Sequence, residues 1–475
     1  MGEARLRGTF VERKMAALNR EKAKLLKGRG DIDEREAAAL HAGITPFLLR
    51  MTGEEWQKRR ANIIDLLKGI NKGSDLERVK PIRVREDEIA WYLFLCKQAL
   101  EDPMCLDVSQ ISRAAPFFCG IGERWQYAKH VKGIEKKIDD LLKKYKTSPD
   151  GLIFEILVAL SYAEKGWEVE FLEEKPPLKS SDMVARKDGK ELYVECKRQD
   201  RRGSYAETER DEFLRLWGAA KHVLVENRQW VWFKGVFHEE ALRLPTDFLE
   251  RIFLEALPLG NGEIMIHDSA EATIYARLID QHAVRRHMEK YRVKSNSAAF
   301  NSVLGGDWVP RNSAVTTIHL IKTSHVEGCE APVLGTYIDE VAWACGFTRD
   351  FDSDISIDKK ARDVTKHLAD AVKQLPDDKP SIIHLAAETL EGKDVERRRT
   401  EKVMATIPNF VAGKPVLGIR FHRLQSNQVI DKLFEFDETV DRFQIDGVNL
   451  DDIPESVVLP SYVERKDGSH WEIYG

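Results

Sequence analysis

Hydrophobic and polar positions in the middle of the chain follow first a helical and then a strand-like period. Ser148 can cap a helix and Pro149 suits its first turn, and the apolar residues that follow recur every three or four positions to about Lys165. Beyond Gly166 apolar and polar residues alternate, which predicts three short strands. They cover residues 167–172, 183–185 and 191–197. A turn at 187–189 is expected to join the last two strands as a hairpin.

The same two periods continue beyond the hairpin. An amphipathic pattern predicts a helix over 205–226, and a run rich in Val, Trp and Phe predicts a strand over 229–237. The order helix–strand–strand–strand–helix–strand is typical of one mixed sheet flanked by helices. We therefore expect an α/β fold whose core covers residues 147–237.

The sequence before this core predicts helices. Residues 1–30 hold nine Lys and Arg against three Glu, so residues 1–45 are interpreted as a basic helical arm. Residues 46–146 are interpreted as an all-helical domain. Its last helix is long and rich in Lys, and it is expected over 123–145.

The sequence after the core is less regular. Residues 238–330 combine a helix expected at 239–257 with Gly- and Asn-containing segments, and they are interpreted as an insertion or peripheral layer. In residues 331–475 a helical pattern returns, followed by strand patterns at 381–386 and 416–421. This C-terminal α/β region either extends the core sheet or forms a separate lobe.

Composition indicates the cellular environment in which the protein is expected. Of the 475 residues 43% are hydrophobic and 32% are charged, which is typical of a soluble globular protein of several domains. No apolar run approaches the roughly 20 residues that a membrane span needs, so no membrane contact is expected. The six Cys are scattered without CxxC spacing, which argues against a structural zinc site and against a disulfide framework. We expect a cytoplasmic protein.

Acidic and basic side chains gather at one edge of the predicted hairpin. Glu195 and Lys197 lie two residues apart on a strand and therefore point to the same face, and Asp182 begins the neighbouring strand. The preceding helix adds Glu155 on its apolar side, where a carboxylate is costly without a partner. Carboxylate oxygens bind divalent cations such as Mg²⁺, and a nearby Lys can orient a water or neutralise charge on a phosphate.

These residues resemble the motif of the PD-(D/E)xK phosphodiesterase superfamily, the restriction-endonuclease-like nucleases. Glu155 lies on the helix before the sheet, Asp182 follows, and Glu195 and Lys197 begin and end an ExK triplet; the resemblance covers roughly residues 148–237. It implies a restriction-endonuclease-like mixed central sheet flanked by helices. It also implies that Glu155, Asp182 and Glu195 bind Mg²⁺, with Mn²⁺ as an alternative, and that the catalytic Lys197 assists the attacking water.

The neighbouring residues qualify this resemblance. Ser181 stands where the family usually has Pro, and no QxxxY follows as in the exonuclease branch, so an endonuclease is expected. Gln199 is in register with the Glu–Lys pair and is a candidate accessory residue of the active site. Arg198, Arg201 and Arg202 follow directly and are candidates for binding a nucleic-acid backbone. The alternative is that this loop is an ordinary solvated turn.

The sequence therefore predicts a Mg²⁺-dependent nuclease, with DNA as substrate, in a setting such as restriction, phage defence, mobile elements or repair. One alternative is an RNase on the same fold, and another is a non-catalytic module that binds nucleic acid or a partner protein. In the plainest structural interpretation Asp182 is a turn residue, and Glu195 and Lys197 form a solvated strand face. Similar folds often act as dimers, so the possible partners include a second copy of the chain.

Overall fold

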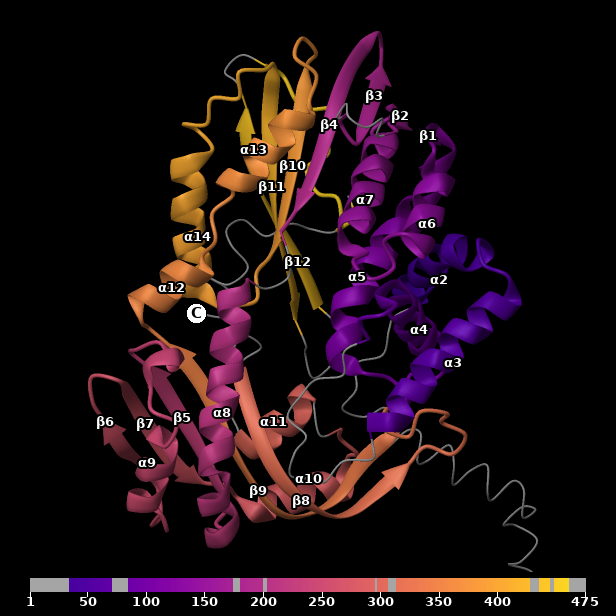
Figure 1. Cartoon of the computed structure of the whole chain (residues 1–475). Helices are drawn as coiled ribbons and strands as arrows, with labels where there is room; N and C mark the ends of the chain where they lie inside the picture. Colours follow the sequence, from indigo (N-terminus) through magenta and orange to yellow (C-terminus); the bar gives the residue numbers. More distant parts are fainter. Residues whose placement is uncertain are drawn as a thin grey trace, which may run out of the picture.

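Helices and two mixed sheets give the protein an α/β architecture (Figure 1). The computed structural model describes residues 34–70, 84–173, 180–199, 203–294, 297–305, 313–427, 435–444 and 448–460. The first sheet occupies the upper half of the view, the second sheet lies below it, and the N-terminal helices stand to the right. Among the described helices, none has the length and apolarity that crossing a membrane requires.

The N-terminal region is built mainly from helices. They are α2 (Glu34–Leu49), α3 (Gly53–Ile70), α4 (Glu88–Glu101), α5 (Val108–Arg124) and α6 (Ile134–Lys143). Asp87 caps α4 by accepting a hydrogen bond from the main-chain N–H of Ala90, and Asp107 caps α5 in the same manner. The buried faces of these helices share one hydrophobic core with the first sheet. Most of the arm expected at 1–45 lies outside the described residues.

The helix expected over 123–145 is not continuous. A 3₁₀ turn, η2 (Trp125–His130), and a two-residue strand, β1 (Val131–Lys132), separate α5 from α6. Gly133 has a φ of 88°, which side chains rarely tolerate, and it lets the chain start α6 in a new direction. The expectation of an all-helical N-terminal domain is therefore wrong at this point, because β1 pairs in parallel with the first sheet.

The first sheet has seven strands in the described part of the chain, in the order β1-β2-β3-β4-β10-β11-β12. Besides β1 they are β2 (Glu168–Phe171), β3 (Met183–Lys187), β4 (Lys190–Arg198), β10 (Ser381–Glu388), β11 (Val416–Asn427) and β12 (Glu435–Gln444). The pairs β2–β3 and β3–β4 are antiparallel, whereas β4, β10 and β11 run parallel. The C-terminal strands thus extend the core sheet, which was one of the two arrangements left open by the sequence.

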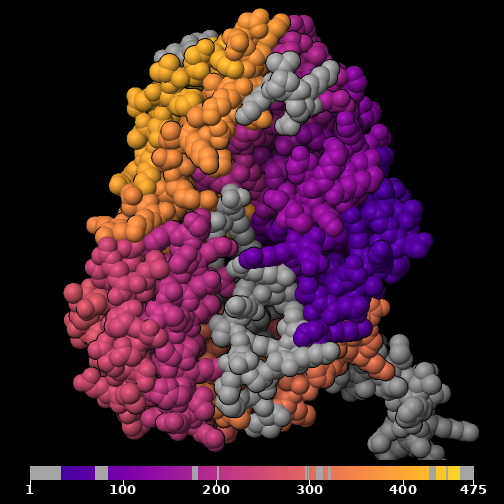
Figure 2. Space-filling model, in the orientation of Figure 1, coloured from indigo at the N-terminus to yellow at the C-terminus, as the bar shows by residue number. Residues whose placement is uncertain are grey.

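Helices cover both faces of the first sheet. They are α5 and α7 (Asp150–Glu164) on one face, and α13 (Thr365–Gln374) and α14 (Lys393–Thr406) on the other. In β10, Ile382 and Ala386 join the core under α7, whereas Ile383 and Leu385 join the core under α13. Since neither face meets water, every residue of β10 is buried. Figure 2 shows the orange C-terminal segments lying against the purple segments of this layered unit.

The second sheet has the order β6-β7-β5-β9-β8 among the described residues. Its strands are β5 (Val231–Phe237), β6 (Glu263–Asp268), β7 (Ala272–Leu278), β8 (Ser313–His325) and β9 (Thr336–Phe351). The helices of this region are α8 (Ser204–Asn227), α9 (Phe248–Ala256), α10 (Gln281–Lys290) and α11 (Ala298–Gly305). An aromatic-rich core, separate from that of the first sheet, holds them together.

The strand expected at 229–237 forms, but it does not lie in the sheet that was expected. As β5 it pairs with β7 and β9, and the parallel neighbour of β4 is β10. Apolar residues on both of its faces suit β10 for the centre of a sheet covered by helices. The Trp and Phe side chains of β5 pack instead in the second core. A strand pattern predicts the strand itself and not its partner.

Residues 238–330 were expected as an insertion or peripheral layer, and they supply β6, β7 and β8 to the second sheet. The helix expected at 239–257 begins later, at Phe248, after a 3₁₀ turn, η3 (Ala241–Arg243). Pro245 lies between the two segments and cannot continue a helix from η3. The chain returns from β9 to the first sheet through α12 (Asp354–Lys360) and α13.

Candidate functional site

The β3–β4 hairpin brings Asp182 next to Glu195. Asp188 and Gly189 both have positive φ, of 50° and 76°, as in the two-residue turns that suit the twist of a hairpin. The resulting register pairs Met183 with Val194, so Asp182, one residue before β3, comes beside Glu195. The main-chain N–H of Asp182 donates a hydrogen bond of 3.2 Å to Oε2 of Glu195. The hairpin expected from the sequence therefore fixes the two acids relative to each other.

A second hydrogen bond orients the Asp182 carboxylate. Its Oδ2 accepts a 2.7 Å hydrogen bond from the main-chain N–H of Cys196. A carboxylate that accepts from the backbone of the opposite strand is held by the sheet itself rather than by a flexible side chain.

Lys197 lies beside Glu195, as the strand alternation predicts. Its ammonium forms an ion pair with Oε1 of Glu195 and donates a hydrogen bond to Oε1 of Gln374. Gln374 is the last residue of α13, which packs against β4. Its main-chain carbonyl also accepts a 3.4 Å hydrogen bond from the Ser181 hydroxyl. The end of α13 thus contacts both the residue before Asp182 and the lysine of the ExK triplet.

Glu155 reaches the site from α7. Its side chain is only 12% exposed, and its Oε2 forms an ion pair with Lys137 of α6. Lys137 was not foreseen, although α6 carries a signal for it. It follows Ile134 by three residues and precedes Leu141 by four, and both of these are buried. That spacing places Lys137 on the inward face of α6, where it supplies the partner that a carboxylate on the apolar side of α7 needs.

Glu155 and Glu195 both interact electrostatically with Asp182. Burial raises the pKa of Glu195 to about 8, and the charge of Asp182 adds to this effect. Burial also raises the pKa of Glu155 to about 7, again with a contribution from Asp182. Burial opposes the charged form of Lys197, but the adjacent Glu195 outweighs it, and the pKa of Lys197 is raised. Glu155 and Glu195 are thus desolvated and repelled by Asp182, and a nearby cation stabilises their ionised forms.

The donor set fits a divalent cation in its chemistry. Carboxylate oxygens are the ligands that Mg²⁺ and Mn²⁺ prefer, and the repulsion among Glu155, Asp182 and Glu195 is what such an ion relieves. In the residues that the structure describes, no group of three or more His, Cys, Asp or Glu side chains is arranged closely enough to hold a metal ion. Instead, the ammonium groups of Lys137 and Lys197 bind the carboxylate oxygens.

Gln199 directly follows β4, and its side chain binds the segment before α13. Its side-chain N–H donates a 2.8 Å hydrogen bond to the main-chain carbonyl of Asp363, in the segment that leads into α13. The residue is 4% exposed. This contact ties the end of β4 to the start of α13, and it gives no direct support to an accessory role among the acids.

Arg198 is not placed on the surface. Its guanidinium lies 4.6 Å from the ring centroid of Phe117 and pairs with the buried Glu388, which also binds Arg113 at 2.8 Å. The Arg198 side chain is 2% exposed. In this position it joins β4 to β10 and α5, and a role in binding a nucleic-acid backbone is not supported by its location. Arg201 and Arg202 lie outside the described residues.

No protein-family model, curated protein or solved structure matches the chain. The chemistry of the site is therefore read from its own residues.

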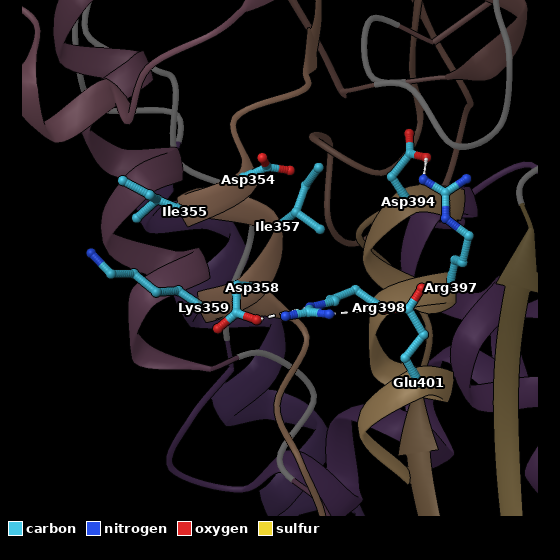
Figure 3. Close-up of a pocket in the computed structure, with 9 residues that line it drawn as sticks. All are labelled: Asp354, Ile355, Ile357, Asp358, Lys359, Asp394, Arg397, Arg398 and Glu401. Atoms are coloured by element: carbon cyan, nitrogen blue, oxygen red, sulfur yellow. Dashed lines mark hydrogen bonds and ion pairs between the residues drawn. The ribbon is translucent and has the colours of Figure 1, made fainter. Parts of the chain in front are cut away.

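A groove elsewhere on the surface differs in character. It has a volume of about 650 Å³ and lies between α12 and α14 (Figure 3). Its charges are paired within the groove, Arg398 with Asp358 at 2.9 Å and Arg397 with Asp394 at 2.8 Å. Such exposed pairs are ordinary features of helix surfaces. The site at Asp182 differs because Glu195 is fully buried and is repelled by Asp182 and Glu155.

Proposed function

We propose that the protein is a Mg²⁺-dependent nuclease of the PD-(D/E)xK type that hydrolyses phosphodiester bonds, with DNA as its substrate. One observation carries the proposal: Asp182, Glu195 and Lys197 meet on a single hairpin. The charge of Asp182 also helps to raise the pKa of Glu155, on the preceding helix. This combination of the buried Glu195, the partly buried Glu155 and Asp182, and one amine is chemically suited to bind a divalent cation beside a phosphate.

The order of elements supports the restriction-endonuclease-like fold as part of this proposal. The sequence α7, β2, β3, β4, α13, β10 gives a helix, an antiparallel meander, a helix on the opposite face, and a strand parallel to β4. The second sheet is inserted between β4 and α13. Such an insertion leaves the core intact, because the chain returns to β4 through α12 and α13.

Each residue of the site has a separate role in the proposed mechanism. Glu155, Asp182 and Glu195 would hold Mg²⁺, which supplies polarisation of the phosphate and a bound water of lowered pKa. Lys197 carries a positive charge at neutral pH, as an ordinary lysine does, and the neighbouring acids raise its pKa further. Its ammonium would orient the attacking water or neutralise charge on the phosphate. Gln374 fixes the direction of that amine.

Cleavage of plasmid DNA with Mg²⁺ present or chelated tests the proposal. Asp182→Ala and Lys197→Ala should abolish cutting by the full chain while circular dichroism shows the parent fold. Asp65→Asn, on the exposed face of α3, is the matched control and should cut like the parent. The proposal fails if both site variants retain parental cutting, or if chelation leaves cutting unchanged.

Running the same assay on RNA separates the alternatives. Cutting of RNA alone would make the protein an RNase of this type. Binding of nucleic acid without cutting of either substrate, by a folded parent supplied with Mg²⁺ or Mn²⁺, would favour the non-catalytic module.

A further inference from the structure

Lys137 brings a positive charge into the candidate site from outside the hairpin. It belongs to α6 in the N-terminal region, and α6 packs against α7, which carries Glu155. Its ammonium pairs with Oε2 of Glu155 and lies 5.0 Å from the ring centroid of Phe171 on β2. The Lys137 side chain is 20% exposed. The amine is therefore held from two sides by the carboxylate and the aromatic ring.

The charge balance of the site explains why an amine lies there. Glu155 is buried beside Asp182, so its ionised form has both desolvation and repulsion to overcome. Lys137 offsets this cost by pairing with the carboxylate directly. Lys197 does the same for Glu195 on the other side of the site. Each of the two glutamates thus has one ammonium group as an internal counter-ion.

These counter-ions bind the oxygens that a divalent cation would need. Lys197 is a member of the motif, so its position beside Glu195 is expected in any state of the site. Lys137 is outside the motif, and its contact with Glu155 is a direct alternative to metal coordination by that carboxylate. A cation that enters the site has to replace the ammonium of Lys137 at Oε2 of Glu155 or bind without that oxygen.

We propose that Lys137 is an internal counter-cation that a divalent metal displaces from Glu155, so that α6 sets how tightly the site binds metal. This inference rests on the proposed function, because it takes Glu155 as a metal ligand. Its physical basis is competition: two cations that require the same carboxylate oxygen reduce each other's affinity, typically by 5- to 150-fold for coupled sites. Removing the charge of Lys137 should therefore strengthen metal binding.

Calorimetric titration of the full chain with MgCl₂ alone, at pH 8.5, tests this prediction without measuring cleavage. Lys137→Met, which keeps most of the side-chain volume, should bind Mg²⁺ about tenfold more tightly than the parent. Lys137→Arg keeps the charge and should bind Mg²⁺ like the parent. Lys136→Met is the matched control, because Lys136 is its neighbour on α6 and pairs with Glu173; it too should bind like the parent.

A second measurement compares melting temperatures, because Lys137→Met leaves Glu155 without its ion-pair partner. Without metal, Lys137→Met should melt at a lower temperature than the parent, and saturating Mg²⁺ should narrow that difference. A purely structural role for Lys137 predicts the same deficit with and without Mg²⁺. Lys137→Gln also removes the charge, but it keeps an N–H donor for Glu155. This variant should bind Mg²⁺ more tightly than the parent as well. It replaces Lys137→Met in the test if Lys137→Met does not fold.

The outcomes separate this inference from the proposed function. If the parent binds Mg²⁺ and cuts DNA but Lys137→Met and Lys137→Gln bind Mg²⁺ equally or more weakly, only the role of Lys137 is wrong. If neither the parent nor these two variants bind Mg²⁺, both proposals are wrong. Tighter binding by the uncharged variants, with Lys136→Met unchanged, supports both.

Discussion

The side-chain oxygen of Gln374 accepts a hydrogen bond from the ammonium of Lys197, and the main-chain carbonyl of the same residue accepts one from Ser181. The last residue of α13 therefore fixes the lysine and the residue before Asp182 at the same time. Pro at position 181 has no hydroxyl and could not make the second bond. Ser181, which stands where the proposed family usually has Pro, thus makes a contact with α13 that Pro could not make.

If the protein is the nuclease proposed above, this relationship predicts that Gln374→Ala slows cleavage without removing it. Lys197 would keep its ion pair with Glu195 but lose the partner that sets its direction, and outer partners of this kind typically contribute about 10- to 100-fold. Steady-state cleavage should show the loss in kcat rather than in KM for DNA. Gln281→Ala, on the exposed surface of α10, is the control and should leave kcat unchanged. Parental kcat for Gln374→Ala would refute the role.

The buried acids predict how stability depends on pH in the absence of metal. The pKa of Glu195 is about 8 in the folded protein, against 4.5 for an ordinary Glu. Between these values the folded state binds more protons than the unfolded state, so this group makes stability fall as the pH rises from about 4.5 to about 8. Denaturation in urea with EDTA, at pH 5.5 and pH 8.5, should show this fall in the parent.

Glu195→Gln isolates the contribution of this one group. Because the amide does not ionise, the variant should lose less stability than the parent between the two pH values. Glu289→Gln, on the exposed face of α10, should lose as much as the parent. If Glu195→Gln and the parent lose the same stability between the two pH values, the pKa of Glu195 is not raised by folding.

The same pKa values predict proton release on metal binding. The pKa of Glu155 is about 7 and that of Glu195 is about 8, so at pH 7 part of the carboxyl population carries a proton that Mg²⁺ has to replace. The apparent affinity for Mg²⁺ should therefore increase from pH 6 to pH 8.5. Titrations at pH 7 in buffers of different ionisation enthalpy measure the released protons directly. Identical heats in all buffers would contradict this prediction.

The buried ion pairs around Glu388 predict a large effect on stability. Glu388 binds both Arg113 and Arg198, and the side chains of all three are nearly inaccessible to water. Glu388→Ala leaves two buried guanidinium groups without this partner and should cost about 3–5 kcal/mol of unfolding free energy. Asp394→Ala removes an exposed pair with Arg397 and should cost about 1 kcal/mol or less. Equal midpoints in urea for the two variants would contradict the argument.

Local patterns predicted the hairpin well because its causes are local. The alternation along β4 and the turn at Asp188 and Gly189 are enough to place Glu195 and Lys197 on one face with Asp182 alongside. The break in the helix expected at 123–145 was also encoded locally, since Gly133 marks it, but a Lys-rich pattern on both sides concealed it.

Pairings between distant segments were not predictable in the same way. Gln374 lies 177 residues beyond Lys197, and nothing in its neighbourhood distinguishes it from other polar residues at helix ends. The assignment of β5 to the core sheet failed for the same reason, since β5 and β10 both have good strand patterns and only packing decides which of them adjoins β4. The role of Arg198 as a buried ion-pair partner depends likewise on Glu388, far along the chain.

The insertion between β4 and α13 has a consequence for synthesis on the ribosome. β4 ends at Arg198, but its neighbour β10 begins only at Ser381, and the second sheet lies between them in the sequence. A nascent chain that stops before Thr365 contains Glu155, Asp182 and Glu195 but lacks both α13, with Gln374, and β10, which pairs with β4. The hairpin then has an open edge at β4, and α7 covers only one of its faces. The full set of contacts around Lys197 can therefore form only after α13 has been synthesised.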